Sequence, residues 1–135
     1  MIYRLEGIKY IQAEKANGEF IYSIELHKLD LVWHLDDPHF YLYRLSDGIV
    51  EKVNRINKLF DSNVAIEMPE IRVMNAKTMP ITDGRHRFLK LKELGKKRIL
   101  VSVSTDSDFQ FMDIIGGIAI DGIETNLKLK SHQNN

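Results

Sequence analysis

The sequence predicts an α+β fold, in which a single compact domain has a small mixed β-sheet and flanking helices. Segments whose apolar residues alternate with polar ones, as in strands, are interspersed with segments whose apolar residues recur every three or four positions, as in helices. The chain has 135 residues, 44% of them hydrophobic, which suits one domain with one core. No internal repeat or linker divides it. We expect the domain to cover residues 1–127 and a flexible tail to cover residues 128–135.

Within the domain we expect an N-terminal hairpin over residues 2–27, a core over residues 28–104 and a C-terminal extension over residues 105–127. Apolar and mostly polar residues alternate from Phe20 to Leu26, which predicts a half-buried strand. Asn17-Gly18, just before this run, favours a tight turn because both residues tolerate positive φ.

The next stretch, residues 29–45, is apolar-rich and aromatic, and Pro38 interrupts it. We therefore expect a short strand or extended piece, followed by a turn at Asp36-Asp37-Pro38. Its aromatic residues either form a wall of the core or stack on nucleobases beside neighbouring basic residues, and the sequence leaves both roles open: Trp33, Phe40, Tyr41 and Tyr43.

Two longer helices are predicted, over residues 47–60 and over Arg87–Leu94. The first has one apolar stripe, made of Ile49, Val53, Ile56 and Phe60. Ser46 or Asp47 can cap its start. In the second helix apolar residues recur at helical spacing, and Gly95 supplies a left-handed stop.

The remaining elements are short. In order, we expect a strand at Ile71–Met74, a turn at 75–77, a second strand at Met79–Thr82 antiparallel to the first, a strand at Ile99–Ser104, a short helix at Asp108–Ile115, and an edge strand at Ile118–Ile120. The mixture of strands and helices supports the α+β class.

Composition narrows the class of protein. The chain has no cysteine, which excludes a disulfide framework, a thiolate metal site and a cysteine nucleophile. The first residues are charged from Arg4 onward and contain no uninterrupted apolar run, so we expect neither a signal peptide nor a membrane span. We accordingly expect a cytoplasmic protein that does not enter a membrane, and the oligomeric state stays open.

Charge is unevenly distributed along the chain. The formal net charge is zero, but residues 77–104 hold eight Lys or Arg against two acidic residues, a net +6 that the rest of the chain balances with −6. Either this segment has an anionic partner, or it is a lysine-rich helix face turned to solvent.

The residues Asp83-Gly84-Arg85-His86-Arg87 form the most chemically distinctive stretch. They lie between a predicted strand and a predicted helix, where backbone amides have no helical partner and attract anions. Glycine permits close approach of a ligand, the two guanidinium groups suit phosphate oxygens, and the imidazole can donate a hydrogen bond or exchange a proton. Asp83 can cap the helix, hold an arginine, or bind a cation such as Mg²⁺ that bridges phosphates.

These features describe a phosphate cradle, although the stretch lacks the GxxxxGK[ST] pattern of a P-loop. A purely structural alternative stays open, in which Asp83-Gly84 is an ordinary turn and both arginines pair with carboxylates elsewhere.

Further candidate residues lie outside this stretch. His34, Asp36, Asp37 and His39 are dense enough to suggest metal ligands, a substrate-side acid or base, or only a polar turn. Glu67 and Glu70 flank Pro69, where either could supply a carboxylate beside the phosphates or pair with an arginine of the cradle.

The stretch DGRHRFLKLKELGKKRILVSV resembles the hallmark of the ParB/sulfiredoxin-like superfamily, which is a strand, a D-G-x-H-R-like turn, a helix ending in Leu-Gly and a further strand. The upstream order is also similar, with a helix at 47–60 and then a strand, PEIRV, that begins at Pro69. The similarity covers about residues 26–104.

This resemblance implies a ParB/sulfiredoxin-like fold in which Asp83 to Arg87 bind the phosphates of a nucleotide, ATP or CTP with Mg²⁺, or of DNA. The implied reaction is phosphoryl transfer or phosphodiester hydrolysis, with Asp83, His86 and Arg87 as catalytic residues. Gly84, Arg85, His86 and Arg87 would bind phosphate, and Asp83 would hold Mg²⁺ or orient a nucleophile. The residues expected on the substrate side are His34, Asp36, Asp37 and Glu70.

Individual branches of the superfamily fit this chain to different degrees. Sulfiredoxin has a cysteine where Arg85 stands, so sulfinic acid repair is excluded here. About 30 residues follow Ser104, too few for the DNA-binding and dimerisation parts of chromosome-partition ParB proteins. The free serine kinase branch resembles DLVWHLDDP but has a glutamate after the histidine, where Asp36 or Asp37 would substitute here. The alternative function is a non-catalytic nucleotide- or protein-binding accessory module of a mobile element.

Overall fold

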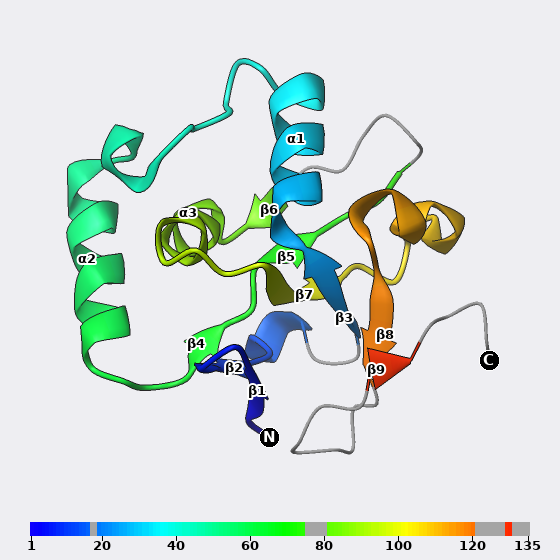
Figure 1. Cartoon of the computed structure of the whole chain (residues 1–135), viewed down its shortest axis with the longest axis horizontal. Coiled ribbons are helices and arrows are strands. Elements are labelled where there is room, and N and C mark those ends of the chain that lie inside the picture. Colours follow the sequence, from blue (N-terminus) through cyan, green and yellow to red (C-terminus); the bar gives the residue numbers. More distant parts are fainter. Residues whose placement is uncertain (17–18, 75–80, 121–128, 131–135) are drawn as a thin grey trace.

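Two long antiparallel strands, β3 (Phe20–Glu25) and β7 (Arg98–Val103), form the centre of the larger sheet in the computed structural model. The structure describes residues 1–16, 19–74 and 81–120 and the backbone of residues 129–130. The sheet has the order β6-β5-β7-β3-β8-β9 (Figure 1), completed by β5 (Glu70–Ile71), β6 (Ile81–Asp83), β8 (Ile118–Ile120) and β9 (Leu129–Lys130). Only β5 and β7 run parallel, so the sheet is mixed.

A smaller sheet, β1-β2-β4, packs beside the larger one. Its strands are β1 (Tyr3–Leu5), β2 (Ile8–Ile11) and β4 (Ile66–Glu67). Strands β1 and β2 form a hairpin whose two turn residues, Glu6 and Gly7, have φ of 49° and 82°, as a type I′ turn requires. A hairpin therefore does form within residues 2–27, but β3 is not part of it and belongs to the other sheet.

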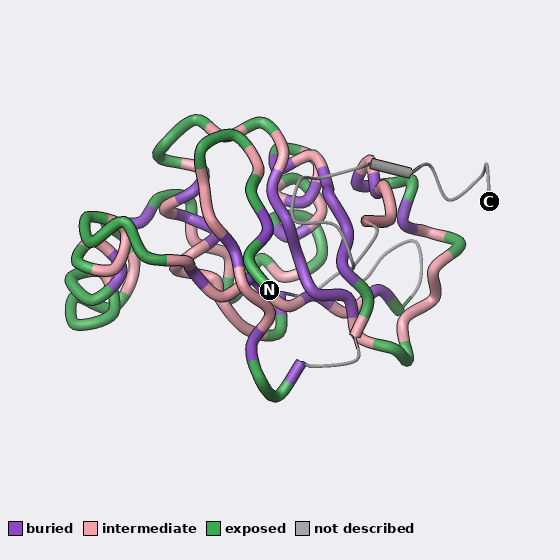
Figure 2. Tube along the Cα trace, turned by 90° about the horizontal axis from the view of Figure 1, so that it is seen from below, coloured by how far each residue is buried: buried purple, intermediate pink, exposed green. Residues whose placement is uncertain are grey.

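Strand β3 is buried on both faces, and the prediction of a half-buried strand was wrong. All four residues from Ile21 to Ile24 are buried, including Ser23. The Phe109 ring stacks on Tyr22, and Arg98 Nε donates to the Ser23 hydroxyl at 2.7 Å, so side chains cover successive residues that point to opposite faces. Figure 2 shows buried residues concentrated along the central strands, whereas the helix at the far left of that view, α2 (Val50–Asp61), exposes its outer side. Alternation along β3 did not reveal that both faces are covered.

Residues expected to be extended form a helix instead, α1 (Leu26–Asp36). Leu26, Leu29 and Trp33 are buried at helical spacing, so one stripe of this segment faces the core. The helix ends two residues before Pro38, where the proline ring disfavours helical backbone in the residue before it. The predicted polar turn thus follows a helix, not a strand.

The other two helices were predicted, with small shifts of their starts. Helix α2 begins at Val50, after a short 3₁₀ turn at Leu45–Asp47, and no side chain caps it. Helix α3 (Arg85–Glu93) begins two residues earlier than expected, and Gly95 follows it with φ of 73°. The sequence DGRHR therefore spans the end of β6 and the first turn of α3.

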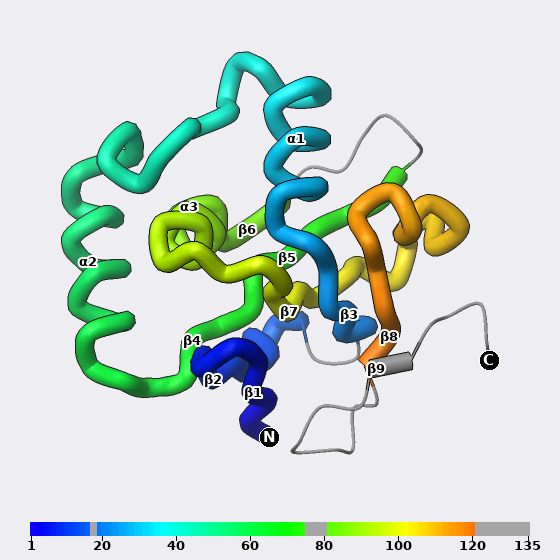
Figure 3. The backbone as a smooth tube through the Cα atoms, viewed as in Figure 1, coloured from blue at the N-terminus to red at the C-terminus, as the bar shows by residue number. Residues whose placement is uncertain are grey.

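Side chains from α1 and α3 meet in the main core. The Trp33 ring packs edge-to-face on Phe88 at 5.8 Å and on Tyr41 at 4.9 Å between ring centroids. Figure 3 shows the result: α3 lies between α1 and α2, and the chain enters it directly from β6. The predicted α+β class with a mixed sheet and flanking helices is confirmed, with two sheets in the described part of the chain.

The C-terminal elements differ in detail from expectation. The short helix is a 3₁₀ helix, Phe109–Ile115, that ends at Gly116 with φ of 66°. Strand β8 is not an edge strand, because it pairs with β3 on one side and β9 on the other. Strand β9 falls in the predicted tail, whose remaining residues lie outside those described. The predicted turns at Asn17-Gly18 and 75–77, and the first residues of the strand predicted from Met79, also lie outside them.

Candidate functional site

A pocket of about 650 Å³ opens where the start of α3 faces one side of α2. Four parts of the chain line it: the segment from His39 to Leu42, the start and inner side of α2, the end of β6, and residues 84–87. All five residues of the DGRHR sequence belong to its wall. The pocket size is typical of sites for small-molecule ligands.

Free backbone amides point out of the first turn of α3. Gly84 is the residue before the helix, with φ of 89° and ψ of 26°, and no side chain caps this end. The first helical hydrogen bond runs from the Phe88 amide to the Gly84 carbonyl oxygen at 2.9 Å. The amides of residues 85–87 therefore precede the hydrogen-bonded part of the helix and are available to an anion. Asp83 is not the cap that the sequence allowed it to be.

Gly84 is required at this position for two independent reasons. Its positive φ lies in the left-handed region, which residues with a Cβ rarely adopt. An added Cβ would also lie 2.9 Å from Pro69 Cα and 2.7 Å from Arg87 Nη2. The glycine thus lets strand β6 turn sharply while the Arg87 guanidinium packs against the turn.

Asp83 is held by two cations rather than by the helix. Its Oδ2 lies 2.8 Å from Lys15 Nζ and 3.8 Å from Arg87 Nη2. The hydrogen bond from Lys15, followed by the nearby charge of Arg87, lowers the pKa of Asp83 although burial opposes this. Asp83 is therefore ionised at neutral pH. The Lys15 contact links residues 68 positions apart in the chain.

Glu70 lies opposite Asp83 on the neighbouring strand β5. Burial raises its pKa, and the charge of Lys15 only partly offsets this effect. Lys15 Nζ lies 3.5 Å from Glu70 Oε2. Two carboxyl groups with oppositely shifted pKa values thus stand side by side behind the start of α3, although only Asp83 lines the pocket.

Arg87 is largely buried, with 15% of its side chain exposed. Its Nε and Nη2 atoms are buried and donate no hydrogen bond within the described residues, because the Asp83 contact at 3.8 Å is too long. Buried donors of this kind are normally satisfied, so unfilled hydrogen-bonding capacity remains beside Gly84.

His86 joins the starts of α2 and α3. Its Nε2 accepts a hydrogen bond from the Ile49 backbone amide at 3.3 Å, and the ring lies against Gly48. Burial, together with the positive charges of Lys52 and Arg85, lowers the pKa of His86. The ring is therefore neutral at pH 7, and because Nε2 accepts, we assign its proton to Nδ1. Nδ1–H is then the atom with which His86 can donate a hydrogen bond.

Cations outnumber anions around the pocket. Lys52, Arg55, Arg85 and Arg87 line it together with Asp47 and Asp83. Both acids have basic partners, since Asp47 Oδ2 lies 3.9 Å from Arg44 Nε and Asp83 is held as described. Within the described part of the chain, Lys52, Arg55 and Arg85 form no ion pair. The pocket therefore has uncompensated positive charge.

The other predicted site residues are not brought together at the pocket. His34 stacks on Tyr41 at 4.4 Å between ring centroids, and Asp37 Oδ2 accepts a hydrogen bond from Trp33 Nε1 at 3.3 Å. Asp36 is exposed at the end of α1. None of these three lines the pocket, whereas His39 from the same stretch does.

Sequence reasoning missed two contributors to the pocket, Lys52 and Arg55 on α2. Their spacing of three residues places them on one side of that helix, together with Gly48. This spacing was a usable signal. No comparable signal existed for Lys15, which reaches Asp83 only through tertiary structure.

A metal site is not evident from the side chains. Across residues 1–16, 19–74 and 81–120, no three His, Asp or Glu side chains are grouped as metal ligands. Asp83, the predicted Mg²⁺ ligand, has the Lys15 ammonium group at its Oδ2, and the Lys15 side chain is 63% exposed and free to withdraw. Asp83 can therefore meet a Mg²⁺ ion that arrives with phosphates, but it does not form a resident site by itself. In the same residues, none of the helices has the length and apolar character needed to cross a membrane.

His86 is expected to make the fold less stable in mild acid. Because its pKa is lower in the folded chain than in the unfolded chain, the unfolded state takes up a proton first as the pH falls. In the unfolded chain the pKa of His86 is about 6.5, and above that pH neutral His86 contributes its full stabilisation to the fold. This stabilisation is lost as the pH falls through the lowered pKa of the folded chain. Protonation would also turn an Nε2–H toward the Ile49 amide.

Thermal unfolding at pH 7.5 and 5.5 measures this effect when the protein is compared with His86→Gln, which can accept the same hydrogen bond without titrating. We expect the melting temperature of the unmodified chain to fall more than that of the variant. Glu19 and Glu70 have raised pKa values and act in the opposite direction, so the difference between the proteins is the readout. Equal changes in both proteins would contradict the assignment.

Comparison of the chain with protein-family models, curated proteins and solved structures found no match. The site is therefore interpreted from its own geometry. That geometry combines an uncapped helix start, unpaired cations and a neutral histidine around one pocket.

Proposed function

We propose that the pocket at the start of α3 binds the phosphate groups of a nucleotide or of a nucleic acid. One observation carries the proposal: four basic side chains surround a helix start with free amides, and the only two acids in the pocket wall are already paired. Phosphate satisfies both the amides and the guanidinium groups. A structural role alone would leave this positive charge uncompensated at the positive end of a helix dipole.

We further propose that the fold is of the ParB/sulfiredoxin-like type. The order of elements supports this proposal, since helix α2 is followed by the short strand β4, by β5 near Pro69, by β6, by α3 and by β7. The DGRHR sequence occupies the junction of β6 and α3, and Gly95 ends α3, as in the motif of that superfamily.

The reaction class we propose is phosphoryl transfer or phosphodiester hydrolysis. In such a reaction Arg85 and Arg87 would neutralise charge that develops on the phosphate, while the amides of α3 fix its position. His86 would donate a hydrogen bond through Nδ1, since Nε2 is engaged by the Ile49 amide. ATP or CTP would bring Mg²⁺ to Asp83, which is ionised and therefore able to bind it once Lys15 withdraws.

A non-catalytic binding module is the second candidate, and a specific observation favours it. The carboxylate best placed to act on a ligand, Asp83, is already neutralised by Lys15 and Arg87, and its lowered pKa makes it a weak base. Asp36 and Asp37, the alternative acids, are absent from the pocket wall. Such a module would bind a nucleotide or a partner protein without turnover.

A thermal-shift screen with and without Mg²⁺ tests the binding proposal. The panel contains ATP, CTP, tripolyphosphate and a short DNA duplex, and a ligand that binds only the folded chain raises its melting temperature. We expect at least one phosphate ligand to stabilise the protein, with a smaller effect in Arg85→Ala. If none does so although the protein is folded, the proposal is wrong.

Hydrolysis assays then separate the two candidates. Release of phosphate from ATP or CTP, or nicking of plasmid DNA, that disappears in both Arg85→Ala and His86→Ala would identify an enzyme. Binding without turnover under the same conditions would identify the module.

A further inference from the structure

Phe40 is an exposed aromatic residue at the mouth of the pocket. Its side chain is 63% exposed and lines the pocket, and Arg85 Cζ lies 5.8 Å from the centre of its ring. The guanidinium group of Arg85 therefore lies over the Phe40 ring, at a distance typical of a cation–π contact. A single exposed apolar side chain is ordinary on a protein surface, but Phe40 is exposed in the wall of a charged pocket, where it can contact a bound ligand.

The neighbours of Phe40 are anchored, so its exposure is not the result of a loose loop. Asp37 closes a turn, since its carbonyl oxygen accepts hydrogen bonds from the amides of Phe40 at 3.2 Å and Tyr41 at 2.9 Å. The Tyr41 ring packs on Trp33 and its hydroxyl donates to Asp30 Oδ1 at 3.0 Å. The chain thus turns Tyr41 toward the core and Phe40 toward the pocket.

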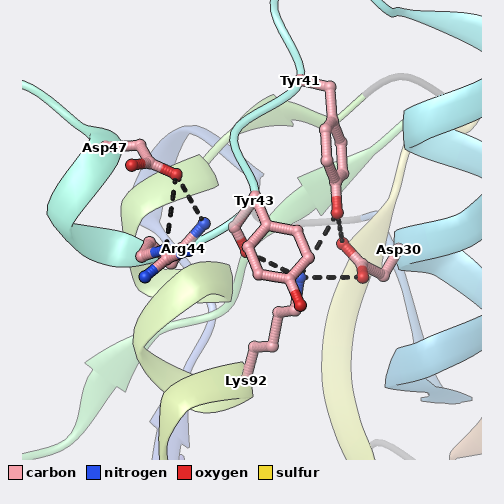
Figure 4. A network of polar contacts seen from close by, with 6 residues as sticks. All are labelled: Asp30, Tyr41, Tyr43, Arg44, Asp47 and Lys92. Atoms are coloured by element: carbon pink, nitrogen blue, oxygen red, sulfur yellow. Dashed lines mark hydrogen bonds and ion pairs between the residues drawn. The ribbon is translucent and has the colours of Figure 1, made fainter.

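Lys92 fastens the same segment to α3 (Figure 4). Its Nζ lies 2.9 Å from Asp30 Oδ2, donates to the Tyr43 carbonyl oxygen at 2.7 Å and to the Tyr41 hydroxyl at 3.3 Å. The contact therefore joins α1, the segment after it and α3 through one ammonium group. Figure 1 shows that this segment runs from α1 to α2. Three of its residues, His39, Phe40 and Leu42, line the pocket, so its position sets part of the pocket wall.

We propose that Phe40 stacks on the planar ring of the ligand whose phosphate binds at Arg85, and that Lys92 is a positioning residue for Phe40. This inference rests on the proposed phosphate site. The pocket wall supplies cations from α2 and α3 and an apolar ring from Phe40, which matches a molecule that has a phosphate and a nucleobase. Every nucleobase has an aromatic face that can stack on the Phe40 ring. We therefore expect Phe40 to favour nucleotides over inorganic polyphosphate without distinguishing one base from another.

A free nucleotide fits better than single-stranded nucleic acid. Single-strand binding surfaces stack successive bases on several aromatic side chains along a groove. Here Phe40 is the one Phe, Tyr or Trp residue in the wall of a pocket of about 650 Å³, within the described residues. Tyr43 is also exposed, but it lies outside that wall and its ring faces Lys92 at 4.5 Å.

Titration calorimetry with ATP, CTP, tripolyphosphate and a six-nucleotide single strand tests the inference on Phe40→Ala and Phe40→Tyr. We expect Phe40→Ala to weaken nucleotide binding by about fivefold or more and to change tripolyphosphate binding less than twofold. Phe40→Tyr should bind both as the unmodified chain does, because it keeps the ring. Lys92→Met, which removes only the ammonium group, should give the same selective loss as Phe40→Ala.

Each other result has a definite meaning. If tripolyphosphate binds and Phe40→Ala leaves nucleotide affinity unchanged, the stacking role is wrong while the phosphate site stands. If Phe40→Ala weakens nucleotide and tripolyphosphate equally, Phe40 acts through Arg85, and the inference is again wrong. If the single strand binds more tightly than any free nucleotide, the ligand class is wrong. If neither tripolyphosphate nor nucleotide binds the unmodified chain, both the proposed phosphate site and the stacking role of Phe40 are wrong.

Discussion

Replacing Gly84 with alanine is expected to destabilise the domain by about 2–5 kcal/mol. Left-handed backbone costs an L-residue about 1–2 kcal/mol, and forcing an extra carbon into a packed site costs roughly 1–3 kcal/mol more. Gly84 meets both conditions, with φ of 89° and with Pro69 Cα 2.9 Å from the added carbon. Chemical denaturation measures the loss, and the melting temperature should fall by roughly 10 °C.

Gly95→Ala is the matched control for this substitution. Gly95 also has a positive φ, 73°, but an added carbon there would meet nothing within 4 Å. We expect this control to cost only the backbone penalty of about 1–2 kcal/mol. If both variants lose the same stability, the close approach of the β6–α3 turn to Pro69 and Arg87 is not what holds Gly84 in place.

Replacing Arg85 with alanine is expected to weaken binding of tripolyphosphate by about 10–100-fold while leaving stability within about 0.5 kcal/mol. A hydrogen bond between charged groups contributes about 1.5–3 kcal/mol, which corresponds to that loss of affinity. Arg85 forms no ion pair within the described residues, and its contact with the exposed Phe40 ring contributes little to the fold. Calorimetry and chemical denaturation of the same samples measure both quantities.

Lys58→Ala provides the control for charge alone. Lys58 is an exposed residue of α2 outside the pocket wall, so its removal lowers the net charge equally. We expect it to change affinity less than twofold at 0.15 M salt, where exposed charges more than about 8 Å apart are screened. Equal losses in Arg85→Ala and Lys58→Ala would mean that the ligand follows overall charge and has no specific contact with Arg85.

Local sequence patterns predicted the parts of the fold that depend on neighbouring residues. The apolar stripe of α2, the stop at Gly95 and the alternation along β7 each identified an element. Helix α1 was missed because Trp33, the aromatic residues after the helix and Pro38 suggested extended chain, and only packing of Trp33 against Phe88 makes its helical spacing meaningful. The burial of both faces of β3 likewise depends on tertiary contacts, such as those of Phe109 with Tyr22 and of Arg98 with Ser23.

The candidate site divides in the same way. One half, from Asp83 to Arg87, is contiguous in sequence and was predicted as a phosphate cradle. The other half comes from Lys52 and Arg55 of α2 and from Lys15, which lie more than 25 residues away in the chain and reach the cradle only in the folded state. The neutral state of His86 is also a tertiary effect, since it depends on burial against Gly48 and on the Ile49 amide.

The most direct test of the phosphate site is amide nuclear magnetic resonance of ¹⁵N-labelled protein during titration with tripolyphosphate. Bound phosphate should shift the amide signals of Gly84, Arg85, His86 and Arg87 most strongly, because these amides precede the first hydrogen bond of α3. The shifts should saturate with ligand and should need about 10–100-fold more ligand in Arg85→Ala. Signals that do not move at these residues, or that move most at the basic stretch Lys96–Arg98 outside the pocket, would contradict a phosphate site at the start of α3.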